Sequence, residues 1–403
     1  MPPGALDNVK VADFTWVIAG PIVTRYLANH GATVVRVESQ AYPDYLRYSR
    51  PYKDNTPGLN TSGLFALYNS DKYSLGLNLK HPKGLELARR LIGWCDVVVE
   101  NFTPGTVERL GLDYEHAKEI KPDIIMLSLS AQGQNGPHCK YPGYGIELQS
   151  LAGFTALLGW PDRSVVQPYG ALTDYISGHL ATAAVLAALD CRRRTGEGAY
   201  IDVSQIESSL QFLAPLIMQY LVSGDDFVRM ANRSTTAVPH GAYRCRGNDK
   251  WVVITVWDDQ QWQKLCQVID QPDLAEARFQ TVTDRMEHVA ELDQIIEEWT
   301  IAKTAEEVIN LLWEHGIEAV PVQDTRDLYE DPQLKHRHHF QVLNHSEMGP
   351  CAYEGSPFKL SKTTSKLNMP APCLGQYNEY VCTNLLGLSD SEFVELLAEG
   401  VLE

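Results

Sequence analysis

The sequence predicts an α/β protein: a large domain built on an open, doubly wound parallel sheet, with a second, smaller α+β domain. The first observation is that short apolar strands alternate with helices through the first 130 residues. Parallel strands that helices cover on both faces form continuous apolar runs of this kind. The second is that a β-hairpin pattern begins near residue 240 and is followed by amphipathic helices up to residue 320. The third is the length of 403 residues, which exceeds one ordinary hydrophobic core.

The strands of the predicted sheet are short apolar segments that mostly end in polar or glycine-containing loops. They are expected at 10–15, 31–38, 73–79, 96–100, 123–129 and 199–203. Helices are expected at 22–30, 81–94, 106–110, 114–120, from Asp174 to Gly196, and at 204–222. Ligands of such sheets bind beyond the carboxyl ends of the strands. No G-x-G-x-x-G sequence follows the first strand, so the dinucleotide fingerprint is absent.

The domain boundaries follow from where this alternation stops and resumes. We expect residues 1–225 and 325–403 to form the large domain, 240–320 the small domain, and 226–239 and 321–330 the linkers. Residues 41–63 are polar and rich in Pro, Tyr and Asn, and are expected to be a long loop. Long loops in compact domains are often functional.

Charge and composition disfavour several classes of function. The net charge of −17 argues against nucleic acid as a partner. The N-terminus lacks signal-peptide features, and no apolar run was found that reaches the ~18 residues needed to span a bilayer. The eight scattered cysteines contain no Cys-x-x-Cys pair, which is typical of reduced, cytoplasmic thiols. His336–His339 lacks matching ligands and is interpreted as a surface helix end, so no metal site is expected.

The most prominent stretch is 167–178, which runs directly into a helix of small apolar residues. Pro168 and Gly170 interrupt regular structure, and a single carboxylate, Asp174, then stands where the helix begins. Taken alone, an aspartate at this position is most simply a helix N-cap.

Several cationic and amide side chains form a candidate binding cluster, and all but Lys72 stand at or just beyond strand ends or in the loops that follow. They are Arg36, Lys72, Asn101, Arg109 and Lys140. Positive groups at that edge of a sheet can bind phosphates. The alternative interpretation is scattered surface charge.

Ordered motifs along nearly the whole chain resemble the class III (formyl-CoA transferase-like) CoA-transferase family. They are Val11–Pro21, Gly31–Glu38, Val99–Gly105 with Arg109–Gly111, Ser130–Pro137 with Gly143-Tyr144, Gly170–Gly178 and Thr195–Val203. The resemblance implies a Rossmann-like large domain, a small domain, and linkers that thread two subunits into an interlocked-ring dimer. A homodimer is expected, with a heteromer containing a paralogous subunit as the alternative.

The resemblance also implies a chemistry for Asp174. It would attack an acyl-CoA thioester, and a covalent aspartyl anhydride and aspartyl-CoA would carry the exchange. CoA thioesters would be the substrates, with no tightly bound cofactor. The implied CoA contacts are Val17, Ala19, Arg36, Leu77, Asn101, Phe102, Arg109 and Lys140.

Two departures from the family pattern bear on the substrate. Ile18 stands where formyl-CoA transferases carry a glutamine, and Gly145 stands where many members carry an acidic residue. Both favour a larger or more apolar acid over oxalate and formate. The N-terminal motif resembles branches of the family that handle aromatic acids such as benzylsuccinate, and the resemblance implies succinyl-CoA as the donor. Tyr144 stands where α-methylacyl-CoA racemases carry a histidine. A tyrosine is a poor base near neutral pH, so CoA transfer is favoured over racemisation. The racemase stays as the alternative activity, and a catalytically inactive scaffold subunit of a heteromer is a second alternative.

Overall fold

The computed structural model describes residues 4–275 and 277–403, which form two compact units. Unit 1 comprises residues up to Ala156, Gln167–Asp226 and Gln333–Glu403, and unit 2 comprises Leu157–Val166 and Phe227–Pro332. The sequence analysis placed 157–166 in the large domain, and the structure corrects this. Of the segments expected to be linkers, residues 227–239 and 321–330 also belong to unit 2.

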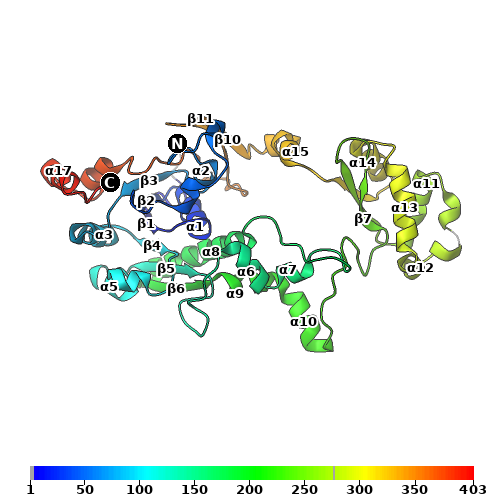
Figure 1. Cartoon of the computed structure of the whole chain (residues 1–403), viewed down its shortest axis with the longest axis horizontal. Helices are drawn as coiled ribbons and strands as arrows, with labels where there is room; N and C mark the ends of the chain where they lie inside the picture. Colours follow the sequence, from blue (N-terminus) through cyan, green and yellow to red (C-terminus); the bar gives the residue numbers. More distant parts are fainter. Residues whose placement is uncertain (1–3, 276) are drawn as a thin grey trace. The chain divides into compact units, whose positions relative to one another are not determined.

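Unit 1 is built on a six-stranded sheet in the order β3-β2-β1-β4-β5-β6, with every pair parallel (Figure 1). The strands are β1 (Lys10–Phe14), β2 (Thr33–Glu38), β3 (Lys72–Gly76), β4 (Val97–Glu100), β5 (Ile125–Ser130) and β6 (Ala199–Ser204). The expectation of a mixed α/β body with a central parallel sheet is confirmed. The strand order reverses between β1 and β4, and the chain leaves these neighbours in opposite directions. A crevice at their carboxyl ends is the usual ligand site of such sheets.

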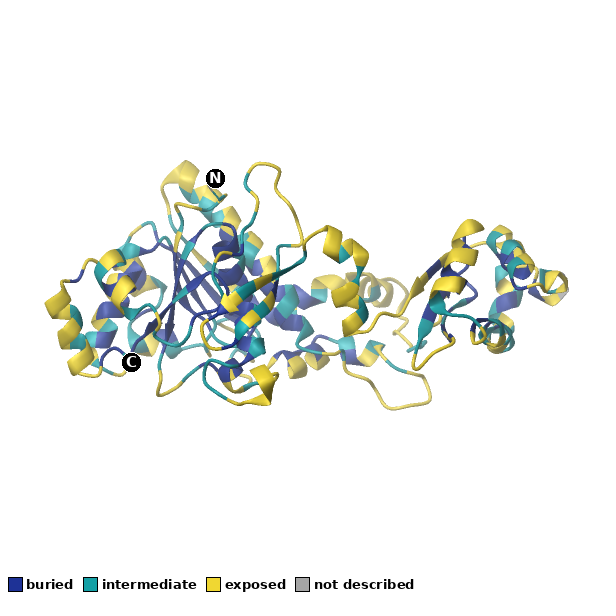
Figure 2. Cartoon of the chain, turned by 90° about the horizontal axis from the view of Figure 1, so that it is seen from above, coloured by how far each residue is buried: buried dark blue, intermediate teal, exposed yellow. Residues whose placement is uncertain are grey.

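Helices cover both faces of this sheet, and buried residues concentrate in its strands (Figure 2). On one face α1 (Ala19–Asn29) and α8 (Leu172–Thr195) pack through a shared apolar cluster that includes Val23, Leu127 and Val185. α3 (Pro82–Trp94) and α5 (Tyr114–Ile120) pack on the opposite face.

α8 is the central helix of unit 1. A Cβ on Gly178 would lie 2.9 Å from the carbonyl oxygen of Ala19, so glycine permits the close approach of α8 to α1. By length and composition α8 is also apolar enough to cross a membrane, contrary to the sequence expectation that no run is long enough. In unit 1 it packs against α1 and β5.

The remaining elements of unit 1 follow the prediction in part. α4 (Thr106–Leu110) lies where a helix was expected, and α17 (Asp390–Ala398) follows near the end of the chain. The single helix expected over 204–222 is interrupted and forms α9 (Gln205–Leu210) and α10 (Ala214–Ser223). Elements that were not predicted are α2 (Gly63–Tyr68), α6 (Gly145–Leu151), α7 (Phe154–Leu157) and the hairpin β10 (Phe340–His345) with β11 (Gly349–Glu354). α16 (Pro332–His336) ends at His336, where a helix end was expected.

Unit 2 is an α+β fold with its own core. Its antiparallel sheet has the order β7-β8-β9 and contains β7 (His240–Arg244), β8 (Trp251–Thr255) and β9 (Glu318–Pro321). Its helices are α11 (Asp259–Val268), α12 (Val282–Glu287), α13 (Val289–Thr300), α14 (Ala305–Glu314) and α15 (Thr325–Glu330). Trp262, Leu292 and Leu312 are fully buried between the sheet and these helices.

Candidate active site

A cavity of about 830 Å³ opens at the carboxyl edge of the sheet in unit 1. The loops after β1, β4 and β5 line it, which is the region where the strand order reverses. Segments 41–48 and 139–145 form further walls, and Asp174 and Gln205 lie among the lining residues.

Asp174 occupies the first turn of α8 and does not cap the helix. The N-cap residue is Ala171, and no side chain forms a cap hydrogen bond. The N-cap interpretation of Asp174 is therefore wrong. The side chain is buried, with only 5% of the residue exposed. Burial raises the carboxyl pKa to about 7, and a hydrogen bond from Gln205 opposes that rise.

Gly145 provides the space that the Asp174 carboxylate occupies. A Cβ on Gly145 would lie 2.7 Å from Oδ1 of Asp174 and 2.6 Å from the Cβ of Ala171. Contact at that distance requires something to shift, so a larger residue would displace the carboxylate or the start of α8. The Thr173 hydroxyl also donates to the Gly145 carbonyl at 3.2 Å, which ties α6 to α8.

Side chains hold the loop between β1 and α1 through its backbone amides. Asn101 accepts from the Trp16 N–H at 2.7 Å and donates to the Trp16 carbonyl at 2.8 Å. The Trp16 ring meets the edge of Phe102 at a centroid distance of 5.7 Å. These contacts join the loops after β1 and β4 into one wall, which also contains Val17, Ile18 and Ala19.

The outer wall is rich in exposed aromatic side chains. Tyr45 and Tyr144 stack at a centroid distance of 6.5 Å, and both are more than half exposed. The other tyrosines on this wall are Tyr42, Tyr48 and Tyr141. An aromatic rim of this kind offers flat apolar surface to a bound ring.

Most of the predicted CoA-contact residues line the cavity, and three do not. Val17, Ala19, Asn101, Phe102 and Lys140 line it, as do the predicted substrate residues Ile18 and Tyr144. Arg109 is exposed and donates to the hydroxyl of Thr106 at 3.0 Å; Thr106 lines the cavity, so Arg109 lies beside it. Leu77 is fully buried and pairs with Leu402 away from the cavity.

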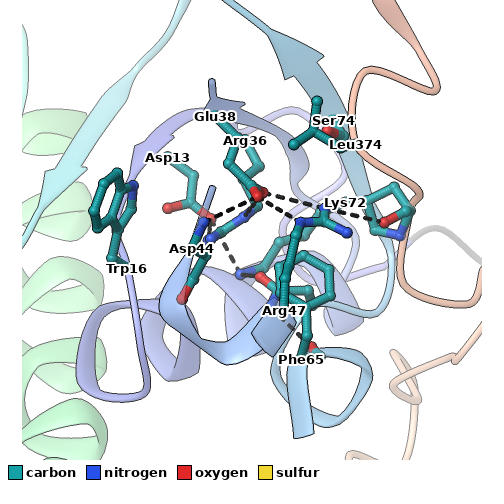
Figure 3. A network of polar contacts seen from close by, with 12 residues as sticks. Asp13, Trp16, Arg36, Glu38, Asp44, Arg47, Phe65, Lys72, Ser74 and Leu374 are labelled. Atoms are coloured by element: carbon teal, nitrogen blue, oxygen red, sulfur yellow. Dashed lines mark hydrogen bonds and ion pairs between the residues drawn. The ribbon is translucent and has the colours of Figure 1, made fainter. Parts of the chain in front are cut away.

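The structure contradicts the expected phosphate contact of Arg36, and it contradicts that of Lys72 for the same reason. Both were candidates for binding phosphates, but both side chains are completely buried. Figure 3 shows them among the residues with which they pair. The Arg36 guanidinium pairs with Asp13, Glu38 and Asp44, and the Lys72 ammonium pairs with Asp13 at 3.1 Å. Both charges are therefore neutralised by buried carboxylates and do not face the cavity.

This buried network is compensated internally. Together with Arg47, which pairs with Glu38, it contains three cations and three carboxylates. Burial lowers the pKa of Lys72 to about 7 against the opposing effect of Asp13. Burial raises the pKa of Asp44, which the nearby Arg36 opposes.

The sequence analysis missed two polar residues near Asp174. Ser130 and Gln205 line the cavity, are more than nine-tenths buried, and each has a side-chain oxygen without a hydrogen-bond partner. Unpartnered buried oxygens are uncommon and require an explanation such as a ligand. The signal in the sequence was slight, since Ser130 ends an apolar strand and Gln205 begins a helix.

No histidine is among the described residues that line this cavity. His240 contacts the carbonyl oxygen of Asn232 through Nδ1 at 2.6 Å, in unit 2. Within residues 4–275 and 277–403, no group of three or more His, Cys, Asp or Glu side chains has an arrangement that could hold a metal ion. All eight cysteines are free.

Comparison with known proteins identifies the family. The model of CoA-transferase family III matches residues 6–378. The chain is 31% identical to succinyl-CoA–D-citramalate CoA-transferase of Chloroflexus aurantiacus, over 100% of this chain and 99% of that protein. It is 30% identical to the beta subunit of succinyl-CoA–L-malate CoA-transferase of the same organism, over 98% of each. The crystal structure of a CAIB/BAIF family protein from Brucella suis superimposes with a TM-score of 0.87 at 29% identity, over 96% of this chain and all of that one. The chain thus belongs to CoA-transferase family III, and the protein is a class III CoA-transferase.

Proposed function

We propose that this enzyme moves CoA from succinyl-CoA to a bulky carboxylic acid, such as the aromatic acid benzylsuccinate, with Asp174 as the covalent carrier. The observation that supports this best is the position of Asp174. It is the only carboxylate among the described residues that line the cavity, and it is almost fully buried. Buried carboxyl groups with raised pKa values in a cavity are characteristic of functional sites.

In the proposed mechanism CoA passes from the donor to Asp174 by two acyl exchanges, and from Asp174 to the acceptor by two more. A carboxylate oxygen of Asp174 attacks the thioester carbonyl, the C–S bond breaks, and CoA leaves as the thiolate. The thiolate then attacks the aspartyl carbonyl of the mixed anhydride, which releases succinate and leaves an aspartyl-CoA thioester. The acceptor carboxylate repeats the sequence in reverse, so that the acceptor leaves as its CoA thioester and Asp174 is free again. Each step breaks one acyl bond and forms another, so no oxidant or metal enters the balance.

The environment of Asp174 suits this chemistry. A mixed anhydride is lost if water reaches it, and burial at the end of the cavity limits access. With a pKa of about 7, a large fraction of the carboxyl is ionised at neutral pH and only weakly solvated. A poorly solvated carboxylate is the more reactive nucleophile.

The proposed CoA contacts are the loops that line the rest of the cavity. Val17 and Ala19 contribute from the loop after β1, Asn101 and Phe102 from the loop after β4, and Lys140 from the outer wall. We further propose that Arg109, beside this wall, neutralises a CoA phosphate. The strand order of the sheet supports the term Rossmann-like for this domain.

Two features of the cavity support a bulky acceptor. Ile18 offers hydrocarbon and no hydrogen bond, and the tyrosine rim offers flat aromatic surface. Burying a phenyl group there would contribute roughly 25 cal/mol per Å² of apolar surface removed from water. Names of relatives that include succinyl-CoA support that donor.

The alternative activity, racemisation at the α-carbon, has less support. It needs two bases on opposite faces of the substrate. No histidine occurs among the described lining residues, and Asp174 has no second carboxylate opposite it there.

We also propose that the working enzyme is a dimer in the cytoplasm. α10 is apolar and none of its residues is buried; Met218, Leu221 and Val222 are more than half exposed. An exposed apolar helix of this kind is typical of a subunit interface. A homodimer is the simplest form, and a heteromer like the one implied by the beta-subunit name of a relative is the alternative. Free thiols are in keeping with a reducing compartment.

Mass spectrometry tests the proposal directly. The purified chain is incubated with a panel of acyl-CoAs and acids, and new thioesters are identified by their masses. Intact-protein spectra should also show an adduct equal to CoA minus water, mapped to Asp174 and absent from Asp174→Ala. Turnover by Asp174→Ala above a few per cent, or an adduct at another residue, would contradict the assignment. Light scattering gives the mass of the assembly.

A further inference from the structure

The cavity wall contains a strained residue that a buried carboxylate holds in place. Val17 has φ = 65°, in the left-handed region. A β-branched residue is rarely found there, because its side chain collides with its own backbone. Its N–H donates to both oxygens of Asp44, at 3.1 and 3.2 Å.

Asp44 also belongs to the opposite part of the wall. Its Oδ1 accepts from the Leu46 N–H at 2.9 Å and so caps the short helical turn Tyr45–Tyr48. Tyr42, Tyr45 and Tyr48, which flank it in sequence, line the cavity. One carboxylate therefore joins the loop after β1 to the tyrosine wall.

Arg36 fixes the position of this carboxylate from behind. Its Nη2 pairs with Asp44, its Nε pairs with Glu38 at 3.1 Å, and its Nη1 donates to the Thr15 carbonyl at 2.9 Å (Figure 3). Both the guanidinium and the carboxylate are fully buried. The pair is therefore rigid and cannot exchange its partners with water.

We propose that Asp44, held by Arg36, is a positioning residue that keeps Val17 in its left-handed conformation and so fixes the two walls of the cavity for CoA. This inference rests on the proposed CoA contacts of the loop after β1. In this proposal Arg36 acts by holding the Asp44 carboxylate in place, and it does not contact a CoA phosphate.

The first test separates backbone strain from side-chain loss at Val17. Val17→Ala and Val17→Gly both remove the isopropyl group, but only glycine adopts a positive φ without strain. We expect Val17→Gly to have a Tm a few degrees higher than Val17→Ala. We also expect Val17→Gly to bind CoA about tenfold more weakly than Val17→Ala, because the loop is then free to leave its conformation. Val165 is exposed and is not among the positive-φ residues, so glycine there should not be more stable than alanine.

The second test compares two buried aspartates. Asp44→Asn should raise the Kd for CoA about tenfold in calorimetry. Asp71→Asn is the matched control, since Asp71 is buried and accepts backbone N–H groups from Asn368 and Met369 at 2.9 and 2.8 Å, away from the cavity. It should lower Tm without changing the Kd for CoA. In the double variant Val17→Gly/Asp44→Asn the two losses of affinity should be less than additive, because both release the same loop.

The outcomes distinguish this inference from the proposed function. If the wild type does not bind CoA, the proposed CoA contacts are wrong. If the wild type binds CoA but Val17→Gly and Val17→Ala have equal affinity for it, or Val17→Gly is the less stable variant, the proposed role of Asp44 in holding Val17 is wrong. Should Asp44→Asn fail to fold, the Val17 pair still decides the question.

Discussion

Replacing Asp174 by asparagine should abolish transfer and stabilise the fold at the same time. The pKa of this carboxyl is raised from 3.8 to about 7, mainly by burial. A difference of about 3 pH units corresponds to about 4 kcal/mol, at 1.36 kcal/mol per unit, as the cost of ionising the group in the folded state. Asparagine carries no charge and keeps the size of the side chain, so it removes most of that cost.

The sign and the pH range follow from proton linkage. Because the folded pKa is the higher one, the stability due to proton binding is complete below pH 3.8 and is lost as the pH rises through about 7. The advantage of asparagine should therefore reach about 2–4 kcal/mol at pH 8, or about 4–8 °C in Tm. At pH 5 the linkage cost is only about 1.6 kcal/mol, so the advantage should shrink.

Thermal unfolding of both proteins at pH 5 and pH 8, followed by circular dichroism, measures this difference. Asp71→Asn is the contrasting variant: its pKa is also raised, to about 6, but its Oδ2 accepts from the Asn29 side chain at 2.8 Å, which the amide nitrogen of asparagine cannot do, so it should be less stable than the wild type. A gain for Asp174→Asn that is absent at pH 8, or equal at both pH values, would refute the reasoning from burial.

Three further predictions concern catalysis. The pH profile of kcat/KM should fall on the acid side with an apparent pKa near 7. Gln205→Leu should move this acid limb to higher pH, because it removes the hydrogen bond that favours the ionised form of Asp174. An acid limb that does not move would contradict the contact between Gln205 and Asp174. Arg109→Ala should raise KM for acyl-CoA several-fold with little change in kcat, and a collapse of kcat at constant KM would exclude a simple phosphate contact. Ile18→Gln should shift the ranking of acids in steady-state assays away from large apolar ones, whereas an unchanged ranking, or a wild type that prefers oxalate, would remove Ile18 from the acid pocket.

The carboxyl edge of the sheet was predictable, whereas which cations face it was not. Arg36 lies near the carboxyl end of β2, as expected, and Lys72 lies at the amino end of β3. Both side chains are nevertheless buried, Arg36 against Asp13 and Asp44, and Lys72 against Asp13. A strand pattern shows where a residue lies along the chain, but not which carboxylates lie across from it. Asn101 and Phe102 follow β4 directly, and for them position along the strand was sufficient.

The sequence by itself determined the alternation of strands and helices and the change of fold near residue 240, and it proposed Asp174 as the nucleophile, because apolar periodicity, helix breakers and motif order can be read along the chain. Only the tertiary structure decided the environment of these residues. The pKa of Asp174 depends on burial and on Gln205 from another helix, and its space depends on the missing side chain of Gly145. The strained Val17 depends on Asp44, 27 residues away along the chain. Desolvation and hydrogen bonding act through space, so their strength is set by neighbours that only the folded chain brings together.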